Sequence, residues 1–468
     1  MTIDRLVLFG ATGDLAARYL LPALAALHAV NRLPHTFRVI GAGREPWDDE
    51  TFRQVAAEAL EQYASDVPTA AREALLRSMR YRSVDLNEPA SVSSVLASGQ
   101  GAVAAYLALP PSAFPPAVRS LAAAGMPPGS RIVVEKPFGT DLESATALNR
   151  SLARVAVTSG EQGVFRVDHV LGMSTVQNLA ALRFVNGVPE AFWSSAHIEQ
   201  VEIHWEETLA LEGRAGYYDA TGALKDVMQN HMLQLLSLIA MEPPATVTER
   251  DLRDRKVEAL RSIRPPSEEE MSLRTRRGRY TAGRLPSPGG DGEREVPAYV
   301  DEDGVDPQRR TETFAEAVFE LDTERWRGTR FVLRAGKALR ERRKMVVLRF
   351  HAGSPIAAAD GPISAPQNEL HIGIDGPEEV ALHLNGGTPT SPAPLVLTAP
   401  PPGGGLPPYG HVLLDVLEGG SALSVRGDEA ELAWRTVAPI LDAWDAERVP
   451  LEEYPAGSPG PSGRGTHS

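Results

Sequence analysis

The first third of the chain alternates short apolar runs with longer segments whose apolar residues recur at helical spacing. Residues 5–9 (RLVLF) form an apolar run of strand length, and residues 15–30 place leucines on one helical face. Further strands are expected at 37–42, 81–84, 103–109 and 131–135, and a second amphipathic helix at 49–63. This alternation predicts a doubly wound parallel sheet, an α/β domain of the Rossmann type.

The pattern changes after residue 164, where strand-like runs lie closer together around one long apolar helix at 222–240. Short connections between strands are typical of antiparallel sheets, so we expect an α+β domain with a large, mainly antiparallel sheet. Pro- and Gly-rich stretches at 285–292 and 386–408 are interpreted as surface loops. The strand-like runs of this half are residues 196–205, 313–321, 346–350, 370–374 and 380–384.

A chain of 468 residues is too long for one ordinary core, so two domains are expected. The change of pattern predicts an N-terminal α/β domain at 1–164 and a C-terminal α+β domain at 165–454. Residues 455–468 consist mainly of Gly, Ser and Pro, and we expect them to form a disordered tail.

Charge and composition exclude several classes of function. A net charge of −14 argues against nucleic-acid binding, and no apolar run is long enough to cross a bilayer. The first residues lack the basic region and cleavage site of a signal peptide, which predicts a cytoplasmic location. The absence of cysteine excludes disulfides, thiolate catalysis and Cys-based metal sites, and no metal is expected. Because the net charge is negative, an anionic substrate would need a local cluster of cations to bind.

A glycine-containing turn, Gly10-Ala-Thr-Gly13-Asp-Leu-Ala16, lies between the first expected strand and the first expected helix. Glycine there lets the backbone approach a pyrophosphate, while the helix N-terminus offers unpaired N–H groups to the anion. Two glycines alone leave a simple tight turn as the alternative. The residues expected to contact a dinucleotide in this turn are Gly10, Thr12, Gly13, Asp14 and Leu15.

The end of the second expected strand, Gly41-Ala-Gly43-Arg44-Glu45, bears on the choice of dinucleotide. An arginine at this position suits the 2′-phosphate of NADP, whereas an acidic residue accepts hydrogen bonds from the ribose hydroxyls of NAD. Arg44 therefore favours NADP, and Glu45 leaves NAD possible. The alternative is that Arg44 is a solvated loop charge.

Seven segments carry a specific resemblance to a known family. They are GATGDLA (10–16), YLALPP (106–111), EKPFG (135–139), RVDHVLG (166–172), GRAGYYD (213–219), KDVMQNHMLQLLSLIAMEPP (225–244) and LRAGKAL (333–339). In order and spacing the chain resembles the glucose-6-phosphate dehydrogenase family. The resemblance implies a dinucleotide-binding domain, then a domain for substrate binding and oligomerisation. It also implies oxidation of a hexose at C1 to a lactone by NADP, in a homodimer or homotetramer.

The resemblance also assigns the chemistry to residues. It makes His231 the general base that takes the C1 hydroxyl proton, with Asp168 as the carboxylate that orients it. A histidine oriented by a carboxylate is chemically suited to this task. Lys136 corresponds to a lysine between nicotinamide and substrate, and Pro137 to a proline that shapes the site. The remaining substrate contacts that the resemblance implies are His169, Glu207, Asp226, Lys337 and Arg342. Arg340, Arg343 and Lys344 are interpreted as solvated charges.

Three positions depart from the family's substrate pocket. Val170 stands where the family has a tyrosine, Met173 where it has a lysine, and Asp375 where a glutamine usually contacts the substrate. A lysine on a phosphate is worth about 1.5–3 kcal/mol. Gly373 replaces an arginine of members that bind a second NADP, so no second site is expected.

These departures leave three functions to consider. Either another arginine or lysine replaces the lost donors and the substrate remains glucose 6-phosphate, or the pocket is retuned. A retuned pocket would suit an unphosphorylated, amino or otherwise C6-modified sugar. A catalytically silent regulatory relative is the third possibility, but such a protein would have no reason to keep His231, Asp168, Lys136 and the glycine turn.

Overall fold

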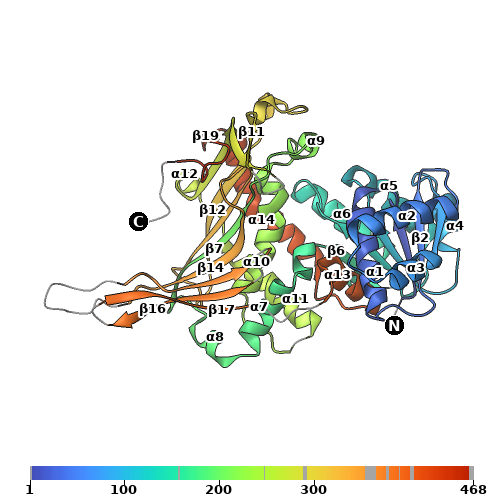
Figure 1. Cartoon of the computed structure of the whole chain (residues 1–468), viewed down its shortest axis with the longest axis horizontal. Helices are drawn as coiled ribbons and strands as arrows, with labels where there is room; N and C mark the ends of the chain where they lie inside the picture. The colour runs from blue at the N-terminus through green and yellow to red at the C-terminus, as the bar shows by residue number, and fades with distance from the viewer. Residues whose placement is uncertain are drawn as a thin grey trace. The chain divides into compact units, whose positions relative to one another are not determined.

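The computed structural model describes residues 3–156, 159–246, 248–287, 292–353, 365–375, 379–388, 391–400 and 405–462. The chain forms two compact units, each assembled from distant parts of the sequence (Figure 1). The first unit comprises residues 1–174, 244–254 and 404–431. The second comprises residues 175–243, 255–403 and 432–468. No helix among the described residues has the length and apolar character that a membrane span requires.

The first unit is built on a seven-stranded sheet in the order β18-β6-β5-β4-β1-β2-β3. Neighbouring strands from β1 to β6 pair in parallel, which confirms the expected Rossmann-like sheet, and β18 is antiparallel to β6. The strands are β1 (Arg5–Phe9), β2 (Arg38–Gly43), β3 (Met79–Ser83), β4 (Ala104–Leu107), β5 (Arg131–Glu135), β6 (Val164–Val167) and β18 (Ser424–Val425).

The helices of the first unit pack in two groups. One contains α1 (Leu21–Ala29), α2 (Asp49–Tyr63) and α3 (Thr69–Ser78), and the other α4 (Pro89–Leu96), α5 (Phe114–Ala124) and α6 (Leu142–Val155). Helix α13 (Pro408–Glu418) packs against α1 and against the short helix η4 (His169–Gly172). The core consists of fully buried strand and helix residues such as Leu6, Leu8 and Leu24.

The expected boundary between residues 164 and 165 therefore needs correction. Strand β6 pairs with β5 and β18, so the segment up to residue 174 belongs to the first unit. Residues 244–254 and 404–431 also return to this unit, because α13 and β18 complete its core and its sheet. The sequence analysis did not predict β6, α13 or β18, and a local period carries no information about such long-range returns.

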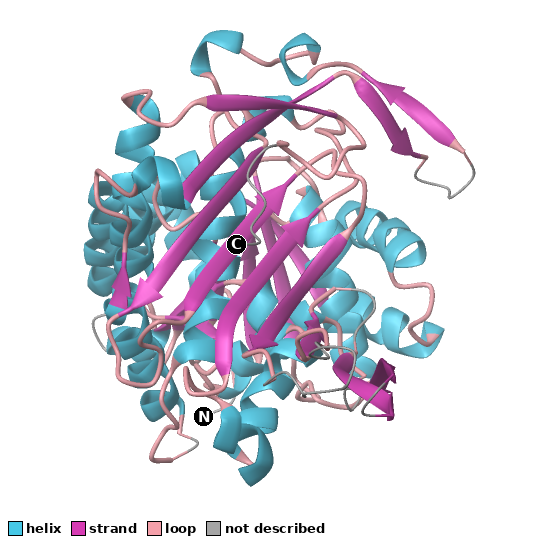
Figure 2. Cartoon of the chain, turned by 90° about the vertical axis from the view of Figure 1, so that its left-hand side faces the viewer, coloured by secondary structure: helices cyan, strands magenta, loops and turns pink. Residues whose placement is uncertain are grey.

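The second unit contains a large sheet in the order β17-β16-β15-β14-β7-β13-β12-β9-β19, with β8 also paired to β12. Figure 2 shows its strands (magenta) lying side by side. The pairing is antiparallel except between β13 and β7 and between β19 and β9, which confirms a mainly antiparallel sheet. The strands are β7 (Ile198–Glu206), β8 (Ile263–Arg264), β9 (Thr275–Thr281), β12 (Phe314–Leu321), β13 (Arg330–Gly336), β14 (Arg343–Phe350), β15 (Glu369–Gly373), β16 (Val380–Thr388), β17 (Ser391–Ala399) and β19 (Leu451–Pro455).

The helices of the second unit are η5 (Leu224–Met232), a π-helix, and α10 (Leu233–Ala240), which continues it. The others are α7 (Ser174–Phe184), α8 (Gly187–Phe192), α9 (Ala215–Tyr218), α11 (Glu249–Ser262), α12 (Met271–Arg274) and α14 (Gly427–Asp445), three of which begin in residues of the first unit. The expected helix at 222–240 is therefore confirmed, with a π-helical first half.

One of the two stretches expected to be loops, residues 386–408, instead contains a strand. Strand β17 covers much of the Pro-rich stretch and, among the described strands, pairs only with β16, at the edge of the sheet. An edge strand tolerates proline because a missing N–H there need not remove a ladder bond. At the other stretch, β10 (Gly283–Pro286) pairs with β11 (Glu293–Val296), and these strands overlap the expected loop at 285–292 only at residues 285–286. Residues 288–291 and 401–404 lie outside the described residues.

The expected tail is ordered over its first part. The backbone N–H of Gly457 donates to the carbonyl of Ala338 at 2.8 Å, and that of Arg340 donates to Ser458 at 2.9 Å. The Arg276 guanidinium donates to the Pro461 carbonyl at 3.1 Å. Backbone hydrogen bonds offset the weak propensity of this composition, so residues 455–462 belong to the second unit. Residues 463–468 lie outside the described residues.

Candidate active site

The glycine turn at the end of β1 has the geometry that a dinucleotide phosphate needs. Gly10 has φ +79°, and a Cβ at that position would lie 2.2 Å from the carbonyl oxygen of Ala108. The N–H of Gly13 donates to the Gly10 carbonyl at 3.0 Å, closing the turn before Asp14 and Leu15 begin the helical segment. The π-helix η1 (Ala16–Leu20) and α1 follow. A tight turn followed by a helix start is an arrangement that can bind anions through its backbone N–H groups.

The end of β2 presents both residues that bear on cofactor choice. Arg44 is exposed, whereas the Glu45 carboxylate accepts a hydrogen bond from the Thr12 hydroxyl at 3.1 Å. The Tyr81 hydroxyl donates to the Glu45 carbonyl at 3.1 Å. Glu45's own backbone amide, together with Thr12 and Tyr81, lowers the pKa of its carboxyl group against the effect of burial. An ionised Glu45 thus lies beside the glycine turn, with Arg44 next to it.

Strand β5 ends in a buried carboxyl group that sequence reasoning did not single out. Glu135 accepts a hydrogen bond from the Tyr106 hydroxyl and a longer one, at 3.5 Å, from Tyr409 of α13. Burial raises the pKa of Glu135 to about 7. Lys136, which follows, is half-buried, and its peptide bond to Pro137 is cis. In the sequence, only its position beside Lys136 could have pointed to Glu135. Its contact with Tyr409 depends on α13, which is distant in the sequence.

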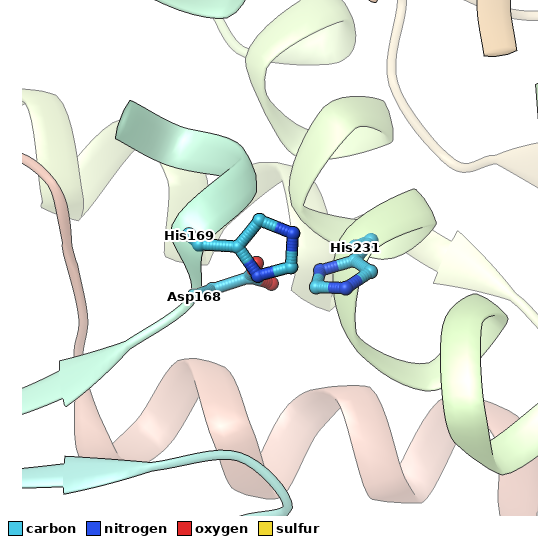
Figure 3. Close-up of side chains that lie close together, drawn as sticks. All are labelled: Asp168, His169 and His231. Carbon is cyan, nitrogen blue, oxygen red and sulfur yellow. The ribbon is translucent and has the colours of Figure 1, made fainter. Parts of the chain in front are cut away.

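Asp168 and His169 lie where β6 runs into η4, and Figure 3 shows both side chains there. Asp168 is fully buried, and its Oδ1 accepts a hydrogen bond from the N–H of Val170 at 3.1 Å. The His169 ring stacks on Tyr409 with ring centroids 5.8 Å apart. Val170 is fully buried in the core, so its side chain offers neither a hydroxyl nor access to a ligand.

His231 lies on η5 in the second unit and is also drawn in Figure 3. It is 2% exposed, and its ring stacks on Trp205 of β7 with centroids 5.1 Å apart. Asp226 precedes it by five residues on the same helix. Because a π-helix bonds residue i to i+5, these two positions are neighbours along the helix. The Tyr217 hydroxyl donates to Asp226 at 3.5 Å.

A cluster of five charged side chains surrounds the end of β7 in the second unit; we call it the β7 charge cluster. The Glu207 carboxylate pairs with Lys337 Nζ at 2.6 Å and with Lys344 Nζ at 3.1 Å. Lys344 also reaches Asp375 Oδ2 at 3.3 Å, and Arg342 Nη2 lies 2.6 Å from the same oxygen. Burial opposes ionisation of Glu207, but Lys337 and Lys344 outweigh it and lower its pKa to about 2. Glu207 is therefore ionised at neutral pH.

Two family models together match nearly the whole chain. The model described as glucose-6-phosphate dehydrogenase, NAD binding domain, matches residues 7–178. The model of the C-terminal domain of the same enzyme matches residues 180–466. The chain belongs to the glucose-6-phosphate dehydrogenase family.

Relatives and solved structures of this family match along almost their full length. A glucose-6-phosphate 1-dehydrogenase of Treponema pallidum is 38% identical, over 97% of this chain and 92% of the relative. That of Zymomonas mobilis is 35% identical, over 98% and 96%. A solved glucose-6-phosphate dehydrogenase in complex with its substrate glucose-6-phosphate has a TM-score of 0.86 at 30% identity, covering 99% of this chain and 97% of the other.

In this member of the glucose-6-phosphate dehydrogenase family, the three cations that were expected to be solvated have different surroundings. Arg340 is exposed, and Arg343 pairs with Glu206, its Nε lying 2.9 Å from the carboxylate. Lys344 is different, and the interpretation of it as a solvated charge is wrong. Its side chain is 11% exposed, and Nζ lies 4.7 Å from the centroid of the Trp205 ring. Alternation along β14 places Lys344 and Arg343 on opposite faces, which a charged run in the sequence conceals.

Asp375, the third departure from the family's substrate pocket, is paired with two cations. Lys344 and Arg342 both pair with it, and they lower the pKa of Asp375 against the effect of burial. The β7 charge cluster thus holds three cations against two carboxylates. A net positive charge remains available to an anionic substrate.

Proposed function

We propose that this chain oxidises glucose 6-phosphate at C1 to the 1,5-lactone with NADP as hydride acceptor. The observation that carries the proposal is the β7 charge cluster, which combines hydroxyl acceptors with excess positive charge beside Trp205, the ring on which His231 stacks. Carboxylates such as Glu207 accept hydrogen bonds from sugar hydroxyls, and the cations suit a phosphate. Membership of a family whose relatives are named for this reaction supports the same substrate.

In the proposed mechanism, His231 removes the proton of the C1 hydroxyl while the C1–H bonding pair leaves as hydride. The C1–O double bond forms from the O–H electrons, so charge and electrons balance. NADP supplies the hydride acceptor when it is bound. Stacking on Trp205 holds the imidazole ring in place, and Asp168 is the carboxylate that the family resemblance assigns to orient it. Glu207 and Asp226 hold the sugar hydroxyls.

We propose that Lys344 supplies the positive charge that Met173 lacks. Its ammonium group is held between Glu207 and Asp375, and Lys337 and Arg342 pair with the same two carboxylates. A phosphate bound by Lys337, Arg342 and Lys344 would meet three cations without the family's usual lysine. Asp375 then serves to position Arg342 and Lys344.

The cofactor assignment follows from the first unit. Gly10, Thr12, Gly13, Asp14 and Leu15 would bind the pyrophosphate, and Lys136 the nicotinamide side. Arg44 would pair with the 2′-phosphate of NADP. Glu45, whose carboxylate lies beside Thr12, supports use of NAD as a second cofactor.

The test is a panel of sugars with NADP and with NAD, followed through the absorbance of the reduced nicotinamide. We expect kcat/KM for glucose 6-phosphate to exceed that for glucose by about a hundredfold or more, since a phosphate contact is worth about 1.5–3 kcal/mol. Glucosamine and glucosamine 6-phosphate complete the panel. Faster oxidation of glucose or glucosamine than of glucose 6-phosphate would refute the proposal, and no oxidation of any sugar would favour a silent relative.

The assembly is proposed to be a cytoplasmic homodimer or homotetramer formed through the second unit, as the family resemblance implies. Sedimentation equilibrium of the purified protein measures the state directly. A single species at the mass of one chain across micromolar concentrations would contradict it.

A further inference from the structure

A groove in the first unit collects arginines away from the glycine turn. Arg5 of β1 pairs in register with Arg38 of β2, and Ile40 of β2 with Arg80 of β3. Because side chains alternate along strands, these four residues share one face of the sheet, and so does Arg82. Together with Asp4, Asp49 and residues 98–100, they line a cavity of about 420 Å³.

Arg5 is the most deeply placed cation in this groove. The residue is 4% exposed, and its Nη2 donates to the Gly101 carbonyl at 3.1 Å. Its Nε and Nη1 are buried and have no hydrogen-bond partner among the described residues. Donors left without partners in the interior carry a desolvation cost, so a site that retains them gains from an acceptor that enters it.

The remaining charges leave the groove positive. Asp49 is shared by Arg80 and Arg82, each at 3.3 Å. The Asp4 carboxylate accepts a hydrogen bond from Thr36 at 3.1 Å. Arg38 is exposed and makes no ion pair with the part of the chain that the structure describes. Four arginines thus face two carboxylates, in a chain whose net charge is −14.

The part of the groove at Arg5 and Arg38 lies at the opposite end of the strands from the proposed cofactor site. The groove extends from there to Arg82, which is in register with Ala42. Arg5 and Arg38 begin β1 and β2, whereas Gly10 and Arg44 follow the ends of the same strands. We propose that this groove is a second ligand site, and that it binds a small anion bearing a phosphate or pyrophosphate group. Guanidinium groups recognise phosphate oxygens through paired N–H donors, and the cavity volume falls in the range of small-molecule sites.

The test uses the full chain saturated with NADPH and glucose 6-phosphate, a combination that fills the proposed active site without turnover. Inorganic pyrophosphate is then titrated by calorimetry at constant ionic strength. We expect saturable binding that Arg38→Gln weakens by about tenfold, the loss of one charge-assisted contact. Arg5→Lys, which keeps the charge but removes the paired donors, should weaken it by a similar factor.

Arg119→Gln is the matched control, because Arg119 is an exposed arginine on α5 of the same unit and does not line the groove. Arg119→Gln changes the net charge by the same amount as Arg38→Gln and should leave the affinity for pyrophosphate unaltered. Absence of saturable binding would overturn the proposal. So would an equal loss in Arg119→Gln and Arg38→Gln, which would mean that pyrophosphate responds only to overall charge. Unchanged KM values for NADP and glucose 6-phosphate in Arg38→Gln would separate this site from the active site.

Discussion

Replacing Lys344 by methionine tests how this chain holds a phosphate without the usual lysine at position 173. Methionine keeps the length and apolar stem of the side chain while removing its charge. Neither carboxylate partner would be left alone, since Glu207 keeps Lys337 at 2.6 Å and Asp375 keeps Arg342 at 2.6 Å. The fold should therefore tolerate the change, and the loss should fall on substrate binding.

The expected magnitude follows from the burial of Lys344. Its side chain is 11% exposed, so its contact with a phosphate would be only partly screened by solvent. A charge-assisted contact of about 1.5–3 kcal/mol corresponds to a rise of about 10- to 100-fold in the KM for glucose 6-phosphate. The KM for glucose, which presents no charge at C6, should change by no more than about twofold.

The assay is steady-state NADP reduction with each sugar, and two further variants support the interpretation. Arg343→Gln removes a neighbouring cation whose partner is Glu206 on the other face, so it should leave both KM values near those of the wild type. Met173→Lys, added to Lys344→Met, should recover about tenfold or more of the lost affinity if position 173 reaches the phosphate. An unchanged KM for glucose 6-phosphate in Lys344→Met, or an equal loss with glucose, would refute the reasoning.

Three further predictions concern the base, the cofactor and a buried carboxyl group. His231→Asn should lower turnover by about two to four orders of magnitude with nearly unchanged NADP binding, as measured by kcat and by a cofactor titration; near-normal turnover would exclude His231 as the base. Arg44→Ala should raise the KM for NADP much more than that for NAD, and equal losses would show that Arg44 does not bind the 2′-phosphate. The pKa of Glu135 is raised to about 7 from a reference value of 4.5, so the folded state holds its proton more tightly than the unfolded state. Its contribution to stability is therefore lost as pH rises from 4.5 through 7, and Glu135→Gln should gain stability relative to the wild type by on the order of 3 kcal/mol over this range. Urea unfolding of both proteins at about pH 5 and about pH 8 measures the difference, and a constant difference would contradict the assignment.

The parts of the fold that local patterns specify were predictable. Apolar runs of strand length identified β1 to β5 of the first sheet and β7, β12, β14, β15 and β16 of the second, but not the other strands. The glycine turn marked the start of the proposed cofactor cradle. Segments whose role depends on distant partners were not predictable in this way. Proline-rich β17 is a strand because β16 offers it an edge, and residues 455–462 are ordered by backbone hydrogen bonds to Ala338 and Arg340.

The candidate site shows the same division. Its backbone elements follow motifs that can be read from the chain, so the positions of Gly10, Asp168 and His231 could be anticipated. The significance of Lys344 could not be anticipated, because it depends on which face of β14 this charge occupies. The significance of Glu135 could not be anticipated either, because it depends on a helix more than 270 residues away in the sequence. Charge runs do not reveal which members are buried.

The return of α13 to the first unit bears on how the protein is synthesised. Residues 412, 413, 416 and 417 of this helix belong to the buried core of a unit whose other core residues lie mostly within the first 167 positions. The N–H of Ile3 donates to the carbonyl of Leu417 at 2.8 Å. A ribosome must therefore translate more than four hundred codons before the N-terminal core can close. Until then the nascent chain exposes apolar surface that only its own late segment covers, so a fragment ending at residue 174 should need a chaperone to stay in solution.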